Sequence, residues 1–117
     1  RELALLHEMR RLRSNTVFLG PYATTSMERA AFRMGTVYLE NLEDPEAAIR
    51  EWREFLEIWP RSLERDDALY GILRATVALE DSLGVHRVAG EFREAFPESR
   101  WLDEVEAIAL EWSSSRL

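Results

Sequence analysis

Two segments of this chain close with the same pattern: an aromatic residue, Pro, any residue and Ser. EAAIREWREFLEIWPRS ends in this way at Ser62, and EFREAFPES does so again, with Pro97 placed 37 residues after Pro60. Proline disfavours the helical conformation in the residue before it, so each ending marks the end of a helix. A chain that ends two helices alike at this interval contains a helical unit that occurs twice.

Apolar residues recur at helical spacing along most of the chain, and no segment shows the sustained alternation of a strand. Before Pro60, for example, Trp52, Phe55 and Trp59 fall on one face of a helix. We therefore predict an all-α fold of about six helices. The expected helices span residues 1–13, 25–42, 45–59, 63–80, 83–96 and 100–113, with a packed loop at 14–24, a turn at 80–82 and a frayed tail at 113–117.

Three local patterns predict helix starts. Thr25 followed by Glu28 has the spacing of a capping box. Asp44 before Pro45 predicts an N-cap, because Asp accepts bonds from unpaired N–H groups and Pro has no N–H to leave unpaired. Ser62 is the candidate cap of the helix that follows Pro60.

The unit that ends at Pro60 aligns with the unit that ends at Pro97. Aligned pairs include Ala48 with Val85, Trp52 with Ala89, Phe55 with Phe92, Trp59 with Phe96 and Ser62 with Ser99, and the preceding helices match with an offset of 38, Phe32 against Tyr70. Helix pairs that recur every 34 to about 40 residues are typical of helical solenoids. Such a pair buries its apolar faces only by stacking on the next pair.

MGTVY at 34–38 with AIREWREFLEIWP at 48–60 resembles a tetratricopeptide repeat (TPR). Such a repeat has a small residue and an aromatic on its first helix, and Ala, a large aromatic, Leu and a terminal Pro on its second. ERDDALYGILRATVALEDSLG with FREAFPES resembles a degenerate second copy. The resemblance implies a right-handed α-α superhelix. It divides the chain into a preceding helix and packed loop (1–24), repeat 1 (25–60), degenerate repeat 2 (61–97) and a terminal or capping helix with its tail (98–117).

The second copy departs from the repeat pattern. Leu73 stands where the small residue belongs, Thr76 replaces Tyr, and Ala89 takes the place of the large aromatic. Gly90 loosens the same helix. We expect this unit either to pack less tightly or to be filled by its neighbour, the helix that begins near Trp101.

The Pro-x-Ser ending and the opening DALY resemble repeats of bacterial cell-envelope proteins, among them the Tol–Pal-associated coordinator and the lipoprotein of the outer-membrane β-barrel assembly machine. VYLENLEDPEAAIREWREFLEIWP, with DALYGILRA and FPESRW, is similar to the large periplasmic lipoproteins of Bacteroidota gliding motility and type IX secretion. The resemblance implies a periplasmic or cell-envelope location, while the cytoplasm stays open. We expect the chain to be part of a longer protein, because it begins with Arg1 rather than Met.

In TPR arrays the first helix of each pair lines a concave groove. The resemblance places in it Arg29, Phe32, Arg33 and Thr36 from the first repeat and Asp67, Tyr70, Arg74 and Ala78 from the second. Aromatic and Arg side chains anchor peptides by stacking and by bidentate pairing with carboxylates, so an acidic or C-terminal segment is the expected ligand. The alternative is that Phe32 and Tyr70 only pack between helices. The arginines then pair with nearby acids, namely Glu28, Asp66 or Asp67.

Residues that carry chemistry are missing or scattered. The net charge of −7 disfavours nucleic acid, and no apolar run is long enough to cross a membrane. The chain has no Cys, and His7 and His86 have no second ligand at suitable spacing, so we interpret both as surface histidines and expect no metal and no cofactor. Paired acids such as Asp66-Asp67 are expected on solvated helix faces, and we expect no catalytic residues.

The first and last expected helices each carry an apolar stripe that this chain leaves without a helical neighbour. The loop residues 17–22, further parts of a longer protein, or a second copy in a homodimer would cover them. We therefore predict a non-catalytic scaffold that binds a protein or peptide. The alternatives are a structural spacer within a long solenoid and a helical accessory domain of an enzyme.

Overall fold

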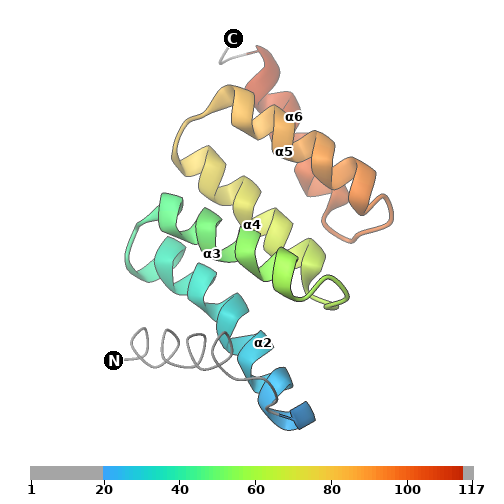
Figure 1. The fold of residues 1–117 in the computed structure, drawn as a ribbon. Coiled ribbons are helices and arrows are strands. Elements are labelled where there is room, and N and C mark those ends of the chain that lie inside the picture. Colours follow the sequence, from blue (N-terminus) through green and yellow to red (C-terminus); the bar gives the residue numbers. More distant parts are fainter. Residues whose placement is uncertain (1–19, 115–117) are drawn as a thin grey trace.

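The structure, a computed structural model, describes residues 20–114, which form a stack of helices (Figure 1). The elements are α2 (Gly20–Thr36), a π-helical turn η1 (Val37–Asn41), α3 (Pro45–Ile58), α4 (Arg65–Ala78), α5 (Ser82–Ala95) and α6 (Leu102–Ser114). These residues contain five α-helices and no strand, so the all-α prediction is confirmed for them. Six helices were expected; the first of them, at 1–13, lies outside the described residues, as does the end of the tail, 115–117.

The start of α2 differs from the prediction. The helix begins at Gly20, so residues 20–24, expected in a loop, are helical, and the rest of that loop lies outside the described residues. Thr25 lies within the helix, and the predicted capping box is therefore wrong. Pro21 explains why Gly-Pro does not interrupt the helix: in the first turn, proline lacks only an N–H that has no helical acceptor.

Both helical hairpins turn in the same way before their second helix. The carboxylates of Asp44 and Asp81 each accept the backbone N–H three residues ahead, at 3.1 and 3.0 Å. The residue before each aspartate has a positive φ, 50° at Glu43 and 56° at Glu80. Asp44 is thus confirmed as the N-cap of α3, and Asp81, predicted only as part of a turn, is the N-cap of α5.

Counted between equivalent positions of its two helices, the first hairpin is one residue longer than the second, and the π-helical turn accommodates this extra residue. The N–H of Leu42 bonds to the carbonyl of Val37, five residues back, at 3.0 Å, whereas α4 ends with the ordinary four-residue spacing. The carbonyls of Tyr38 and Thr76 then both accept the N–H of the capping aspartate that follows, at 2.8 and 3.4 Å. The offset is therefore 38 residues before this turn and 37 after it, as the sequence alignment predicted.

The two corners that contain proline have the same geometry. Trp59 and Phe96 end their helices with similar backbone angles, φ −120° and ψ 70° against φ −133° and ψ 62°. The N–H of Ser62 bonds to the carbonyl of Trp59 at 3.1 Å, and that of Ser99 to the carbonyl of Phe96 at 3.2 Å. Each serine Oγ accepts the N–H two residues ahead, at 3.1 and 3.0 Å. The predicted equivalence of the corners is confirmed.

Ser62 does not cap α4, contrary to the prediction. The helix begins at Arg65, and the bond from the N–H of Glu64 to Ser62 Oγ closes the corner instead. Leu79 follows the last residue of α4, Ala78, and is 39% exposed. The other ends of α3 to α6 lie within two residues of their predicted positions.

Trp52 lies at the centre of the core and is 2% exposed. Gly35 of α2 and Gly71 of α4 approach its ring so closely that a Cβ on either would overlap it. Its indole N–H donates to the carbonyl of Phe32 at 3.1 Å. One side chain of the first hairpin therefore packs against the first helix of both hairpins.

In the second hairpin, the large and the small residue of this packing arrangement exchange places. Leu73 corresponds to Gly35 and Ala89 to Trp52, and both belong to the same core cluster, at 0% and 1% exposed. A large residue on the first helix is thus combined with a small one on the second. The expected looser packing is not found at these positions.

Consecutive helices pack against each other, so α4 lies between α3 and α5, and α6 packs on α5 (Figure 1). α2 also contacts α4, which brings the first helices of the two hairpins side by side. That neighbourhood positions the candidate site.

Candidate functional site

A depression of about 290 Å³ lies where α2, α3 and α4 meet the turn before α6. We term it the groove; its lining residues are Phe32, Thr36, Trp52, Asp67, Tyr70, Gly71, Arg74 and Trp101. Five predicted groove residues are among them: Phe32, Thr36, Asp67, Tyr70 and Arg74. The structure therefore brings predicted residues of both hairpins together on one surface.

Three predicted residues do not line the groove. Arg29 lines a different pocket, described below, and Ala78 is exposed at the last position of α4. Arg33 is exposed and follows Phe32 directly, so it points about 100° away from Phe32 around the helix. The resemblance assigned these three residues to the groove, but in the structure they do not line it.

Packed aromatic rings form the floor of the groove. Phe32 lies edge-on to Phe55, with ring centroids 5.7 Å apart, and is tilted against Trp52 at 6.1 Å. Phe32 is half-buried, so it packs between helices and also faces the groove. The sequence left open that Phe32 only packs between helices; the structure agrees in that Phe32 packs there, but it also lines the groove.

Tyr70 and Trp101 form one wall. Their rings are stacked 4.3 Å apart with planes 7° from parallel. The Trp101 indole N–H donates to Asp67 at 2.6 Å, and Arg100 bonds to the same carboxylate at 3.1 Å. The Arg100 guanidinium also lies over the indole, 5.0 Å from the ring centroid. The wall is held from several sides, and a ligand would meet it preformed.

Charged groups stand at the rim. Arg74 pairs with Glu40 at 3.3 Å, and both side chains are about half exposed, at 45% and 50%. Such a pair contributes about 0–1 kcal/mol, so a ligand carboxylate can replace Glu40 at little cost. If the groove residues only packed and paired within the chain, Arg74 was expected to pair with Glu28, Asp66 or Asp67. Its partner is Glu40 instead.

Partial burial raises the pKa of the Tyr70 hydroxyl above its ordinary value. The negative charge of Glu104 raises this pKa further, and Arg74 opposes the shift. Tyr70 therefore presents a neutral hydroxyl to the groove.

Sequence reasoning missed Trp101, Trp52 and Gly71 as groove residues. Trp52 was expected on the apolar face of its helix, where it also lies, and Gly71 had no assigned role. Trp101 was expected near the start of the last helix; it precedes α6, and its indole bonds to Asp67 of α4. Its place directly after the corner, two residues beyond Ser99, was the available signal.

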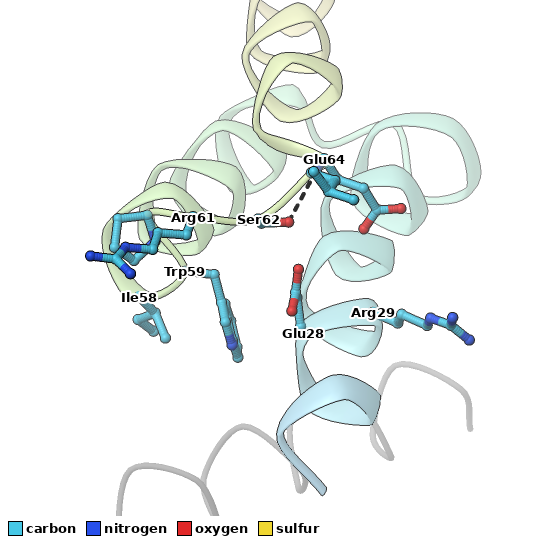
Figure 2. Close-up of a pocket in the computed structure, with 9 residues that line it drawn as sticks. Glu28, Arg29, Ile58, Trp59, Arg61, Ser62 and Glu64 are labelled. Carbon is cyan, nitrogen blue, oxygen red and sulfur yellow. Dashed lines mark hydrogen bonds between the residues drawn. The ribbon is translucent and has the colours of Figure 1, made fainter. Parts of the chain in front are cut away.

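A larger hollow of about 610 Å³ lies at the first corner, between α2 and the chain that joins α3 to α4 (Figure 2). We term it the corner pocket; it is lined by Glu28, Arg29, Ile58, Trp59, Pro60, Arg61, Ser62, Leu63 and Glu64. Figure 2 shows the carboxylate of Glu28 between Trp59 and Ser62, whereas Arg29 and Arg61 point outward. Leu63 is 95% exposed.

Partial burial raises the pKa of Glu64 above its ordinary value. The negative charges of Asp67 and Glu28 raise it further, and the weaker effect of Arg29 opposes them. The ionised carboxylates at this corner therefore repel one another and favour a positively charged neighbour.

Within residues 20–114, no group of three or more acidic or His side chains is placed to hold a metal ion. No helix in the same range has the length and apolar character that crossing a membrane requires. His86 is half-buried on α5 rather than on the surface, and within this range its Nε2 has no hydrogen-bond partner. His7 lies outside the described residues.

Comparison of the chain with protein-family models, with curated proteins and with solved structures gives no match.

Proposed function

We propose that this chain is a TPR-like segment of a right-handed helical solenoid and acts as a non-catalytic scaffold that binds a protein or peptide in its groove. The groove carries the proposal, because the first helices of two hairpins contribute Phe32, Thr36, Tyr70 and Arg74 to it. The equivalent corners and N-caps support the repeat. The resemblance to bacterial cell-envelope repeats supports a periplasmic or envelope location within a larger protein.

The groove offers two kinds of contact. Its aromatic floor and wall suit an apolar side chain, and Arg74 at the rim suits a carboxylate, which a guanidinium binds with two parallel bonds. The preferred ligand is therefore a short segment with an apolar side chain next to a carboxylate, such as a free C-terminus.

The test is an NMR titration of the ¹⁵N-labelled full chain. The probe is the peptide Gly-Ser-Gly-Leu-Phe with a free C-terminus, compared with the same peptide amidated. We expect shifts at Thr36, Tyr70 and Arg74, and an affinity at least about tenfold lower for the amidated peptide or for Arg74→Glu. Arg87→Glu is the matched control, because Arg87 is exposed on α5, and we expect it to bind normally. Equal losses in both variants would show a nonspecific effect of charge.

A structural spacer is the second candidate. The Tyr70–Trp101 wall favours it, because the stack and the bonds to Asp67 satisfy these groups without a ligand. Two observations together would support the spacer. The peptides would move no groove signal at millimolar concentration, and a displayed peptide library selected on the full chain would give no ligand sensitive to Arg74→Glu.

A further inference from the structure

A second depression adjoins the groove. It has a volume of about 300 Å³, lies between α4 and α6, and is lined by Arg74, Val77, Ile108, Glu111 and Trp112. We term it the α6 hollow. Arg74 also lines the groove. The two depressions therefore meet at one guanidinium, and a ligand that crosses Arg74 reaches both.

Apolar side chains that belong to the core line the α6 hollow. Trp112 is 4% exposed, so it forms the floor. Val77 and Ile108 are half-buried and pack against the main core cluster, which holds these walls in place without a ligand. The hollow and the groove, at about 300 and 290 Å³, are each at the lower limit of ligand sites, about 300–1,000 Å³. Each therefore suits a single side chain of a larger ligand.

The charge between the two depressions favours an acid. Arg74 is 45% exposed, and its bond to Glu40, at 3.3 Å, is screened by solvent and easily replaced. A guanidinium prefers a carboxylate, which it binds with two parallel bonds. The ligand is thus expected to place a carboxylate between two apolar side chains.

A carboxylate in this central position belongs to a side chain rather than to a chain end. If the ligand ended at Arg74, its terminal carboxylate would leave the α6 hollow empty. An Asp or Glu side chain satisfies the same guanidinium and lets the main chain of the ligand continue toward Val77 and Ile108.

The distance between the depressions selects the spacing of the ligand. On α4, the groove is centred near Tyr70 and Gly71 and the hollow near Arg74 and Val77, about 7–8 Å further along the helix axis. The hollow is also displaced sideways, from the side of α2 to the side of α6, by about 5–10 Å for packed helices. The two centres are therefore about 9–13 Å apart.

An extended segment spans this distance with every second side chain on one face. A strand rises about 3.3 Å per residue, so side chains two positions apart are only about 7 Å apart and those four positions apart reach about 13 Å. The residue midway between them points to the same face and meets the guanidinium. The pattern that fits is apolar-x-acidic-x-apolar.

We propose that the groove and the α6 hollow together bind an extended internal segment of a partner protein with this pattern. The first apolar side chain lies over Phe32 in the groove. The acidic side chain takes the place of Glu40 at Arg74, and the second apolar side chain fills the hollow against Val77 and Ile108. This inference rests on the proposed function, because the groove is one of its two subsites.

The probe is the acetylated and amidated heptapeptide Gly-Leu-Ser-Asp-Ser-Leu-Gly, in which the Asp carboxylate is the only charge. It is titrated into the ¹⁵N-labelled full chain. We expect NMR shifts at Thr36 and Tyr70 in the groove and at Val77 and Ile108 in the hollow. Replacing the second Leu with Ala should remove the shifts in the hollow alone and lower the affinity about tenfold.

The position of the acid has its own matched control. The peptide Gly-Leu-Asp-Ser-Ser-Leu-Gly, capped in the same way, has the same composition and the same spacing between its Leu residues, but its Asp points to the opposite face of a strand. We expect it to bind about tenfold more weakly, and equally to the peptide in which Asn replaces the central Asp.

The hollow is tested from the protein side by truncating one wall. In Ile108→Ala, the peptides with Leu and with Ala at the second apolar position should bind almost equally. Leu56→Ala is the control, because Leu56 is also half-buried against the core but lines neither depression. We expect this variant to retain the tenfold difference between the two peptides.

Equal affinity of wild type for the Leu and Ala peptides overturns the proposal, as does equal affinity for the two positions of Asp. In either case shifts at Thr36 and Tyr70 would still support the proposed function. If neither this peptide nor the one with a free C-terminus shifts these two signals, the groove itself is not a site, and both proposals are contradicted.

Discussion

At the scale of single residues, size exchange between partner positions explains how two unlike sequences form equivalent hairpins. Trp52 requires glycine at position 35 and at position 71, because its ring occupies the space that a Cβ would need. The second hairpin combines Leu73 with Ala89 instead, and both are fully buried. Each hairpin thus combines one large and one small residue at these two positions, and both large residues are buried.

Gly35→Ala is expected to destabilise the protein by about 1–3 kcal/mol, because the new Cβ overlaps the ring of Trp52. Gly90→Ala is the matched control, since its Cβ would meet only the end of Arg93, at 3.9 Å. Within a helix it should stabilise by about 0.5–1 kcal/mol. Urea unfolding measures both changes. Equal effects of the two variants would contradict the close approach at Gly35.

The charge of Glu64 carries a pH dependence. The pKa of Glu64 is raised in the folded state, so the folded protein holds this proton more tightly than the unfolded chain does. Above the folded pKa the ionised carboxylate therefore lowers the free energy of unfolding. Glu64→Gln should therefore raise the melting temperature at pH 7. The difference from wild type should shrink as the pH falls through the folded pKa toward about 4. A difference that stays constant between these pH values would assign the effect to something other than ionisation.

At the scale of elements, the two hairpins have equivalent ends rather than equivalent faces. Asp44 and Asp81 cap the second helix of each hairpin, and serines at 62 and 99 close the corners. The π-helical turn absorbs one extra residue in the first hairpin, so the ends keep their geometry despite unequal lengths. These short-range bonds set the directions in which the helices leave each turn.

Asp44→Ala and Asp81→Ala should each destabilise the protein by about 1 kcal/mol, because each leaves one helix N-terminus without its cap bond. Chemical denaturation of the two variants checks the value. Asp103→Ala, an exposed acid in the first turn of α6 without such a bond, is the comparison and should cost less. Equal costs at all three positions would show that charge near the N-terminus matters more than capping.

Two contacts between elements are expected to differ strongly in energy. The pair Arg53–Glu91 joins α3 to α5 at 2.6 Å, but both side chains are 41% exposed, so a double-mutant cycle should give at most about 1 kcal/mol, and less in high salt. The half-buried Asp67–Trp101 bond is expected to give a larger coupling that salt barely changes. A reversed order would mean that solvent screening does not decide these energies.

At the scale of the whole molecule, the hairpins share one core. Trp52 contacts both α2 and α4, and α3 packs on α4 across the boundary between the hairpins. We therefore expect a single unfolding transition. Trp52→Ala, a large-to-small change of about 3–5 kcal/mol, should lower hydrogen-exchange protection in α2 to α5 together. Protection that is retained in α4 and α5 alone would show that the hairpins unfold separately.

The outer face of α6 bears on assembly. The apolar stripe of the last helix, expected to lack a helical neighbour, is buried where α6 packs on α5, with Val105 0% and Trp112 4% exposed. Leu110 is 72% exposed on another face of α6. If this face mediates the homodimer that the sequence left as one alternative, Leu110→Glu should convert dimer to monomer in sedimentation. A wild-type chain that is monomeric at high concentration would exclude that interface.

The sequence by itself determined the helices, the two corners, the capping aspartate before Pro45 and the one-residue slip between the units. These features depend on local signals, namely apolar spacing, proline and short-range capping bonds, which are read within a few residues. The five correctly expected groove residues came instead from the resemblance to a tetratricopeptide repeat, which assigns the first helix of each pair to the groove.

Only the tertiary structure decided which of those residues meet. Whether Arg29 or Trp101 reaches the groove depends on helix rotation and on a bond that joins residues 34 positions apart. Whether Ala89 leaves a gap depends on Leu73 on another helix. Such outcomes follow from packing between elements, because a side chain's surroundings are set by what the fold brings against it.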